Sequence, residues 1–392
     1  MLYMLRQYNI SISEKIMPYF HYIILIIFVF VIYYIFRFKY KNKYWLNQVI
    51  YNKYDPRLWG KKGFIVNNAK ITKYFESKIY SCNWIELDHT KKCVLGWFLN
   101  KHYTYYKDLV SKINTKKLQS LFTKHNKKCF VSLFYENHKK NSKIIGSIVS
   151  KPLEGRLYNK NLNLYTFDYI CGINKLSYFK TLYTHFKRHI ESVNDKIFVF
   201  RTSEKIEIST SLISINSFLY SIKFFPRKVV NSYNGVKIIL LNSSNYRLFM
   251  NTFYKLYEVF DCFLHVHLSQ LLYLCDQKII NICVYLVNNK LLCCYFFKNN
   301  HSLHNNSYTI TLVGSYQGEA PRELFLEGFY NAIVYISNSI KIKSLLIDDL
   351  GQNSIFIEEV KKYKLLQMYT SYIYFYNFVY NSFKKDQVLL LY

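Results

Sequence analysis

Two apolar runs, Tyr372-Ile-Tyr-Phe-Tyr-Asn-Phe378 and Val388-Leu-Leu-Leu-Tyr392, close the chain and are separated by a basic turn at Lys384-Lys385. A chain end is usually frayed and polar, whereas this one stays apolar up to its last residue. The two runs predict a C-terminal hairpin or strand pair that brings the α-carboxylate of Tyr392 into the protein. A carboxylate held in this way has a fixed position and a shifted pKa, and it could serve as a base. The alternative is an edge strand whose carboxylate lies in solvent.

The composition is that of a large and strongly basic protein. The chain has 392 residues, of which 51% are hydrophobic and 19% aromatic, so two packed lobes or one double-size α/β unit can form. The 53 Lys and Arg residues against 24 Asp and Glu residues give a net charge of +29. This charge favours nucleic acid, acidic membranes or phosphate-bearing cofactors as partners, but a codon bias towards Lys explains it equally well. The nine Cys residues form no CxxC pair and predict reduced, buried thiols.

Residues 16–36 carry no formal charge and are long enough to span a membrane as a helix. Arg37, Lys39, Lys41 and Lys43 follow directly. Because positive residues flank the cytosolic end of a span, we expect a single-pass membrane protein whose body faces the cytoplasm. A cleaved signal peptide is disfavoured because no small-residue cleavage site follows, and a buried core helix is the remaining alternative.

The rest of the chain alternates between strand and helix patterns that recur in two halves. The first half predicts helices at 90–103 and 115–124, strands at 129–135, 143–149 and 164–171, a helix at 176–193 and a strand at 196–202. The second half predicts a strand at 236–241, helices at 244–260 and 264–275, a hairpin of 279–286 with 291–297, a strand at 308–313, a helix at 321–337 and a strand at 344–347. The common order predicts a duplicated α/β fold whose strand–helix–strand part is similar to an acetyltransferase unit. His265-Val-His267 could hold a metal, but the helical pattern there and the lack of a third ligand disfavour a metal site.

Six segments, in one order along the chain, carry a family resemblance: Tyr44-Trp45-Leu46-Asn47-Gln48-Val49, Trp84-Ile-Glu-Leu-Asp88, Lys143 to Val149, Phe167-Asp-Tyr-Ile-Cys171, Leu346-Ile-Asp-Asp-Leu-Gly-Gln-Asn353, and the closing pair Tyr372 to Phe378 with Val388 to Tyr392. They are similar, in turn, to the N-myristoyltransferase segments Phe-Trp-x-Thr-Gln-Pro, Trp-x-x-Leu-Asp, Leu-Val-Gly-Phe-Ile, Ile-Asn-Phe-Leu-Cys, Ala-Leu-Asp-Leu-Met-Glu-Asn, and the family ending Tyr-Tyr-Leu-Tyr-Asn-Trp with Val-Gly-Leu-Val-Leu. The chain therefore resembles that family from about residue 43 to residue 392.

The resemblance implies an α/β (α+β) fold in which two tandem acetyltransferase-like (GNAT) halves form one saddle-shaped mixed sheet. We expect an N-terminal segment, 1–40, that contains the transmembrane helix, and a basic irregular arm, 41–82. An acyl-CoA-binding half, 83–230, and a peptide-binding half, 231–392, would follow. The implied reaction is transfer of a myristoyl group from myristoyl-CoA, a co-substrate, to the N-terminal glycine amine of a protein. No permanently bound cofactor, metal or nucleic acid is expected. The alternative is a catalytically degenerate member that acts as a membrane-anchored binding or structural component.

The resemblance also assigns candidate site residues. The terminal carboxylate of Tyr392 would accept a proton from the glycine amine, backbone N–H groups of Tyr169 and Ile170 would form an oxyanion hole, and Thr202 would lie near the amine. Six residues are assigned to acyl-CoA and two to the peptide, namely Tyr44, Trp45, Cys171, Lys175, Lys180 and Thr181, and then Asp349 and Tyr376. In the family's phosphate loop, Leu-Arg-Ser-Lys-Arg-x-Ala-Pro, this chain has Leu176-Ser-Tyr-Phe-Lys-Thr-Leu-Tyr183, which leaves Lys180, with Lys175 beside it, as the charged groups. A solvated helix face for Lys180 and a helix N-cap for Asp349 are the alternatives.

Overall fold

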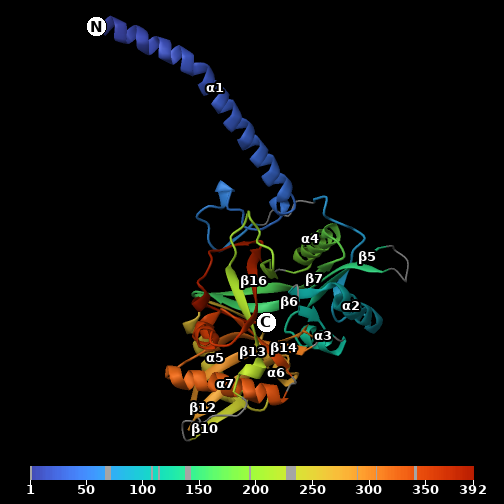
Figure 1. The fold of residues 1–392 in the computed structure, drawn as a ribbon. Coiled ribbons are helices and arrows are strands. Elements are labelled where there is room, and N and C mark those ends of the chain that lie inside the picture. The colour runs from blue at the N-terminus through green and yellow to red at the C-terminus, as the bar shows by residue number, and fades with distance from the viewer. Residues whose placement is uncertain are drawn as a thin grey trace. The chain divides into compact units, whose positions relative to one another are not determined.

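The computed structural model describes residues 2–66, 72–106, 109–113, 115–136, 143–193, 196–226, 235–288, 290–305, 307–339 and 342–392. The chain divides into two compact units, Met1–Gln48 and Val49–Tyr392. Figure 1 shows both units and the order of their elements along the chain.

The smaller unit consists of the long helix α1 (Leu2–Lys41) and the short 3-10 helix η1 (Trp45–Asn47). Within α1, the stretch Tyr22–Lys41 is apolar and long enough to cross a membrane, and its side chains are exposed. The predicted span, residues 16–36, lies inside this helix. A membrane anchor and a signal sequence both have such a helix.

The larger unit contains seven α-helices among the described residues: α2 (His89–His102), α3 (Thr115–Phe122), α4 (Lys175–Ser192), α5 (Arg247–Val259), α6 (Leu268–Asp276), α7 (Arg322–Ser339) and α8 (Ser354–Val360). Short 3-10 helices are η2 (Pro56–Leu58), η3 (Ile222–Phe224), η4 (Gly351–Asn353) and η5 (Lys385–Gln387). The strands of the first half are β1 (Phe64–Ile65), β2 (Tyr80–Asn83), β3 (Thr104–Tyr106), β4 (Leu109–Ser111), β5 (Phe130–Tyr135), β6 (Ile144–Leu157), β7 (Lys160–Gly172), β8 (Phe198–Thr202) and β9 (Ile213–Ser221). Those of the second half are β10 (Val236–Leu240), β11 (Cys262–His265), β12 (Ile280–Val287), β13 (Lys290–His304), β14 (Ser307–Tyr316), β15 (Ile342–Asp348), β16 (Leu365–Tyr376), β17 (Phe378–Val379) and β18 (Val388–Leu391).

One mixed sheet organises the larger unit. Among the described residues it has sixteen strands, and its main path runs β10-β12-β13-β14-β15-β9-β16-β8-β7-β6-β11-β18. Antiparallel neighbours predominate along this path, with parallel pairs at β14 and β15, at β7 and β8, and at β11 and β18, and helices cover the sheet (Figure 1). The predicted α/β class with a large mixed sheet is therefore confirmed.

The same local topology occurs twice in the sheet. In the first half, β5, β6 and β7 are antiparallel neighbours, α4 crosses over, and β8 returns parallel to β7. In the second half, β12, β13 and β14 are antiparallel, α7 crosses over, and β15 returns parallel to β14. The order of elements in the sequence predicts this repetition.

The strand period explains how both faces of the first half are covered. Successive side chains of a strand point to opposite faces. In β5, Val131 and Leu133 belong to the apolar core that contains Leu95 of α2. Ser132 between them is hydrogen-bonded to His185 of α4, with 2.8 Å between Oγ and Nδ1. The helices α2 and α4 therefore pack on opposite faces of this part of the sheet.

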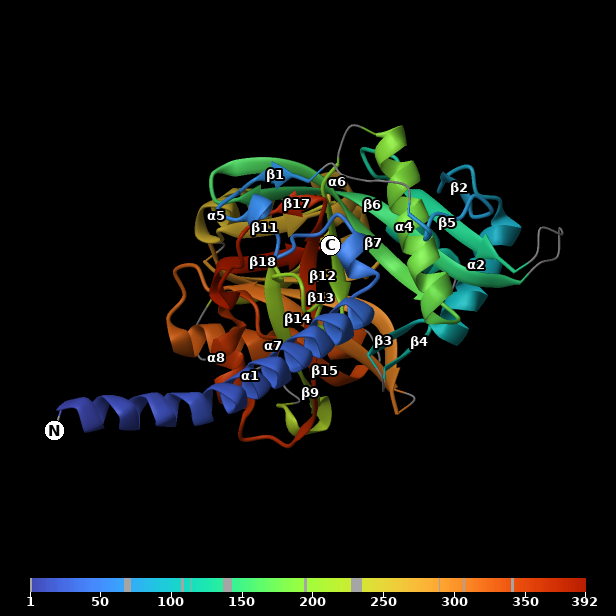
Figure 2. The ribbon, with the colours of Figure 1, turned by 90° about the horizontal axis from the view of Figure 1, so that it is seen from above.

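The two halves interlock because each contributes a strand beside the other. The last strand of the first half, β9, pairs with β15 of the second half. The long strand β16 of the second half inserts between β9 and β8, pairing with both. In Figure 2, which views the molecule from above, strands of both halves again run through the middle of the larger unit. Each half therefore depends on strands of the other half to complete its hydrogen bonding in the sheet.

The predicted C-terminal hairpin is wrong. Both edges of β16 are occupied by β8 and β9, so β18 cannot pair with it. Instead, β18 lies parallel to β11, with Cys262 opposite Val388 and His265 opposite Leu391. The sequence pattern placed residues 264–275 in a helix and missed β11, because a strand of four residues has too few positions to show a period of two. The strand β18 ends the path of the sheet, and its side chains from Val388 to Leu391 are buried.

Candidate functional site

A β-bulge in β7 is the first element of the site. Ser147 lies opposite Cys171, and Val149 lies opposite Asp168. One residue of β6 therefore faces two residues of β7, Tyr169 and Ile170. Tyr169 has a φ of 51°, which is uncommon for a residue with a side chain and typical of bulges and functional sites. The bulge turns the backbone of Tyr169 and Ile170 out of the regular ladder.

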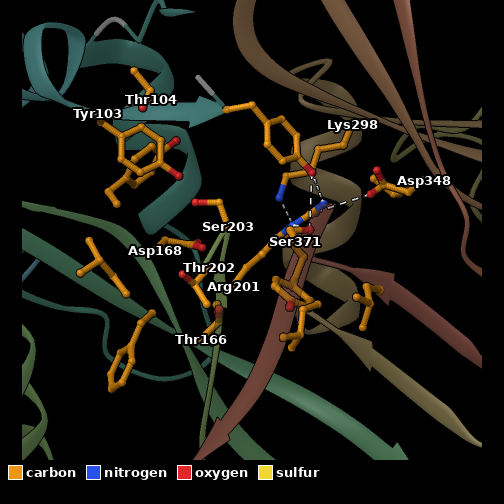
Figure 3. A pocket seen from close by; sticks show the side chains of 18 of the residues that line it. Tyr103, Thr104, Thr166, Asp168, Arg201, Thr202, Ser203, Lys298, Asp348 and Ser371 are labelled. Atoms are coloured by element: carbon orange, nitrogen blue, oxygen red, sulfur yellow. Dashed lines mark hydrogen bonds and ion pairs between the residues drawn. The ribbon is translucent and has the colours of Figure 1, made fainter. Parts of the chain in front are cut away.

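Next to the bulge, β7 and β8 separate. Their parallel pairing covers Tyr165↔Phe198 to Phe167↔Phe200. Beyond these pairs, the next residues of both strands line a cavity of about 220 Å³. Figure 3 shows the side chains of Asp168, Arg201 and Thr202 around this cavity. Where the two strands diverge, their facing backbone N–H and C=O groups are no longer hydrogen-bonded to each other. A ligand in an extended conformation can reach these groups there.

The structure brings together all four residues that the sequence assigns to catalysis. Tyr169, Ile170, Thr202 and Tyr392 line this one cavity. Tyr169 and Ile170 come from the bulge and Thr202 is the last residue of β8. Tyr392 follows β18, whose position β11 fixes. Residues far apart in the sequence thus meet where the two halves interlock.

The main-chain oxygen of Tyr392 is held by Lys298 of β13. Nζ of Lys298 donates a hydrogen bond to the main-chain oxygen of Tyr392 at 2.5 Å and lies 5.8 Å from the centre of its ring. Burial, together with the nearby charge of Lys151, lowers the pKa of Lys298 to about 8, against the opposing effect of Asp168. Tyr392 is therefore fixed in the cavity.

An ion pair beside the bulge carries buried charge. Nζ of Lys151, on β6, lies 2.7 Å from the Asp168 carboxylate, and the Lys151 side chain is only 2% exposed. Burial acts to raise the pKa of Asp168, but Lys151 and Lys298 outweigh it, so this pKa lies below its ordinary value. Asp168 is therefore ionised at neutral pH.

A second polar cluster lies across the cavity, around Arg201 of β8. Its guanidinium donates to Oγ of Ser371 at 2.9 Å and to the hydroxyl of Tyr106 at 2.7 Å, and it lies 3.5 Å from the carboxylate of Asp348. Oγ of Ser217 donates to the same carboxylate at 2.5 Å. Figure 3 draws the interactions of Arg201 with Ser371 and Asp348 as dashed lines. The cluster joins strands of both halves at the wall of the cavity.

The residues assigned to acyl-CoA are more dispersed. Tyr44 and Trp45 belong to the smaller unit, where their ring centroids lie 4.9 Å apart. Cys171 is buried, which raises the pKa of its thiol to about 12. Lys175 is the first residue of α4.

Two further residues of this set are engaged within the fold. Nζ of Lys180 forms an ion pair with Glu76 at 2.8 Å. Thr181 is fully buried under Gly146, and its hydroxyl donates to the carbonyl of Ser177 at 2.7 Å. Thr181 therefore stabilises the packing of α4 on β6, and the structure does not bring it to the cavity.

The residues assigned to the peptide are also used within the protein. Asp349 accepts from the N–H of Asn216 at 2.7 Å and pairs with Lys385, while burial raises its pKa. Its neighbour Asp348 lines the cavity instead. Tyr376 lies in an aromatic cluster, with its ring 4.4 Å from that of Phe186. The structure brings neither Asp349 nor Tyr376 to the cavity.

Sequence reasoning missed four charged residues of the site, namely Lys151, Asp168, Arg201 and Lys298. A signal for them exists, because each is a charged residue within or at the end of a strand that is otherwise largely buried. Such residues are rarely buried unless paired, so an isolated charge in an apolar strand points to a partner elsewhere. The partner cannot be identified until the strands are placed.

His265 takes no part in a metal site in the described structure. Its ring is buried and hydrogen-bonded to the hydroxyl of Tyr257 and the carbonyl of Val266. In the part of the chain that the structure describes, no group of three or more His, Cys, Asp and Glu side chains could hold a metal ion.

Comparison with known proteins identifies the fold. No family model matches the chain, and no curated protein sequence matches it. Solved structures of N-myristoyltransferase from Saccharomyces cerevisiae are similar. One with bound myristoyl-CoA has a TM-score of 0.69 and 11% identity, over 90% of this chain and 94% of that chain. A second has a TM-score of 0.68 at 11% identity and covers 89% of this chain and 99% of that chain. A third, with myristoyl-CoA and inhibitors, has a TM-score of 0.67 at 11% identity and covers 89% and 95%. At this identity the likeness shows that the chain has the N-myristoyltransferase fold.

Proposed function

We propose that this protein is an N-acyltransferase that moves a long-chain acyl group, myristoyl by resemblance, from acyl-CoA to the N-terminal glycine amine of a peptide or protein. The observation that carries the proposal is the meeting of the β7 bulge and the main-chain carboxyl group of Tyr392 in one cavity. An acyl transfer needs donors for the thioester oxygen and an acceptor for the amine proton. These are the two functions that the bulge and the carboxyl group supply.

In the proposed reaction the amine nitrogen attacks the thioester carbonyl carbon. A C–N bond forms, the C–S bond breaks, and the CoA thiolate leaves and takes up a proton. Backbone N–H groups of Tyr169 and Ile170 stabilise the negative charge that develops on the carbonyl oxygen. In a chain that ends at Tyr392, the terminal carboxylate takes the proton of the amine, and Thr202 orients that amine.

We also propose that Tyr22–Lys41 anchors the protein to a membrane with the larger unit on the cytosolic side. The apolar stretch is followed by positive residues, which favours this orientation. An anchor would keep the enzyme next to the membrane that its acylated products enter.

A second candidate function is a binding or structural role without catalysis. It is favoured by the ion pair between Lys180 and Glu76. The resemblance assigns Lys180 to a CoA phosphate, but in the structure its charge is already paired with that of Glu76. A capping box, in which Asn174 and Ser177 exchange hydrogen bonds, satisfies backbone N–H groups at the N-terminus of α4. A protein of this kind would bind acyl-CoA weakly or hold it without turnover.

One experiment separates these functions. The full-length protein, in detergent or nanodiscs, is incubated with alkyne-labelled myristoyl-CoA and peptides that start with Gly, and the product is measured by mass spectrometry. Matched peptides that start with Ala or with acetylated Gly are the controls. We expect an amide product only with a free N-terminal glycine. Binding of acyl-CoA without product supports the second function, and absence of acyl-CoA binding excludes both.

A further inference from the structure

Lys298 lines the cavity of the proposed reaction, although none of the steps described above involves it. It lies on β13 of the second half, and it lines the reaction cavity through the contact of its Nζ with the main-chain oxygen of Tyr392. Lys298 also lines a second cavity of about 60 Å³, together with Asp168 and His301. The residue thus forms part of the wall between the two cavities. A cavity of this size holds a few water molecules at most.

Charged groups surround Lys298 from several elements. Lys151 on β6 and Arg201 on β8 are positive, and Asp168 on β7 and Asp348 on β15 are negative. His301, on the same strand as Lys298, is hydrogen-bonded to Nζ of Lys117 at 3.1 Å, and burial lowers its pKa to about 3. His301 is therefore neutral at neutral pH. With the Tyr392 carboxylate, the cluster around the cavity contains three positive and three negative groups when Lys298 is charged.

We propose that Lys298 holds the Tyr392 carboxyl group in place and receives, through it, the proton that the substrate amine loses. The proposal rests on the proposed acyl transfer. An ordinary α-carboxylate has a pKa of about 3.5 and an ordinary α-amino group one of about 8, so a carboxylate alone is about 10⁴-fold too weak to keep the amine proton. Lys298, whose pKa burial lowers to about 8, matches the amine.

The proton balance is complete in this scheme. The N–H bond of the substrate amine breaks as an O–H bond forms on the carboxyl group. That O–H bond then breaks as the neutral amino group of Lys298 gains the proton and becomes an ammonium group. The ammonium group returns the proton to water through the second cavity, which Lys298 also lines. Lys298 must therefore be neutral when the reaction begins.

The test uses two variants of Lys298 and a matched control on the same strand. Lys298→Met removes the amino group and keeps the apolar stem, and Lys298→Arg keeps the hydrogen bond with a group that stays charged. Lys290→Met, at the exposed start of β13, breaks a surface ion pair with Glu319 and is the control. Circular dichroism and thermal melting verify that each variant is folded.

The first measurement does not depend on activity. In protein labelled with ¹³C at the tyrosine carboxyl carbon, the terminal carboxyl group is titrated by NMR. We expect Lys298→Met to raise its pKa by about 1–3 units, because a neighbouring positive charge is lost. Lys298→Arg and Lys290→Met are expected to leave it low. An unchanged titration in Lys298→Met overturns the proposal.

The second measurement is kcat against pH. In the wild type, kcat is expected to rise between about pH 7 and 9 as Lys298 loses its proton. The similar pKa values of the substrate amine and of Lys298 set the position of this rise. Lys298→Arg should lose this rise, and Lys298→Met should lower kcat about 100-fold at unchanged affinity for acyl-CoA. A wild-type pH profile in Lys298→Arg overturns the relay. If the NMR shift is present in a protein without turnover, the pairing of Lys298 with the carboxyl group is supported and the proposed function fails.

Discussion

Nζ of Lys151 and the carboxylate of Asp168 lie 2.7 Å apart, and this contact joins β6 to β7 beside the bulge. The negative charge at this position is therefore matched by a positive charge on the adjacent strand. Removing one partner leaves the other buried without compensation, which is costly.

We expect Asp168→Asn to lower the free energy of unfolding by about 3 kcal/mol, since the buried ammonium group of Lys151 loses its partner. Urea denaturation of the variant and the wild type measures the difference. The double variant Lys151→Met with Asp168→Asn should recover most of the loss, because it removes both charges. A double variant as unstable as Asp168→Asn alone would show that the pair is not what stabilises this region.

Extension of the chain after Tyr392 tests the role of its carboxyl group. Adding Gly-Ser-Gly converts the carboxyl group into an amide, which cannot accept the amine proton, so kcat should fall at least about 100-fold. The dissociation constant for acyl-CoA, measured by isothermal titration calorimetry, should stay the same. The same tripeptide added at the N-terminus is the control. Unchanged turnover in the extended protein excludes this carboxyl group as the base.

Acid sensitivity is expected from the buried histidines of α4. His185 is hydrogen-bonded to Ser132 and Ser150, and burial lowers its pKa to about 3. Below about pH 6.5 the unfolded chain binds a proton at this residue while the folded protein does not, so stability falls progressively as the pH drops from about 6.5 towards 3. At pH 5 the loss is about 2 kcal/mol for this residue. Burial also lowers the pKa of His189 well below its ordinary value, and that residue adds to the effect.

Urea midpoints at pH 7.5 and pH 5.0 measure this dependence. His185→Gln retains an amide that can hydrogen-bond to the serines but cannot take up a proton. We expect this variant to be less stable than the wild type at pH 7.5 and to lose less stability between the two pH values. An equal loss in both proteins would contradict the assignment to His185.

Gly314 of β14 determines how closely β18 packs. A Cβ atom at this position would clash with Cδ1 of Leu389, which is fully buried. Gly314→Ala should therefore destabilise the protein by about 1–3 kcal/mol. It should also lower kcat, because β18 positions Tyr392. Thermal melting and the peptide acylation assay measure the two effects.

Leu389→Ala supplies the coupling test for this contact. Alone, it should destabilise the protein by about 2–5 kcal/mol by opening a cavity. Combined with Gly314→Ala, it makes room for the new methyl group, so the double variant should be more stable than the sum of the single effects predicts. Strict additivity would contradict the close packing of the two residues.

Much of the fold follows from the sequence because its signals are local. The sequence pattern predicts the helices α2 to α7 and the strands from β5 to β8, and their order predicts the repeated α/β unit, whereas the short helix α8 was missed. The pairing of β11 with β18 could not be predicted, because β11 has only four residues and its partner lies more than a hundred residues away. Pairing of strands far apart in the chain depends on the whole sheet, and no local pattern records it.

Only part of the candidate site could be predicted from the sequence, again because its residues come from strands far apart in the chain. The family resemblance placed Tyr169, Ile170, Thr202 and Tyr392, and the structure brings these four together. It placed Asp349 where the structure has Asp348 at the cavity. Asp348 is the last residue of β15 and Asp349 follows it, so an offset of one residue exchanges a residue at the cavity for one that bonds to Asn216 and Lys385. The partners of Lys151 and Lys298 depend on strand order and could not be inferred from either residue alone.

The exchange of β9 and β16 between the halves has a consequence for synthesis of the protein. When β9 leaves the ribosome, neither of its sheet partners, β15 and β16, has been translated. Its apolar residues, which include Ile213, Ile215 and Leu219, are buried in the finished fold and have no cover until the second half arrives. Pairing over such a distance is slow and exposes nascent strands to aggregation. The excess of Lys and Arg over Asp and Glu gives nascent chains a positive charge, so they repel one another during this interval. The basic composition would therefore lower the risk of aggregation during synthesis.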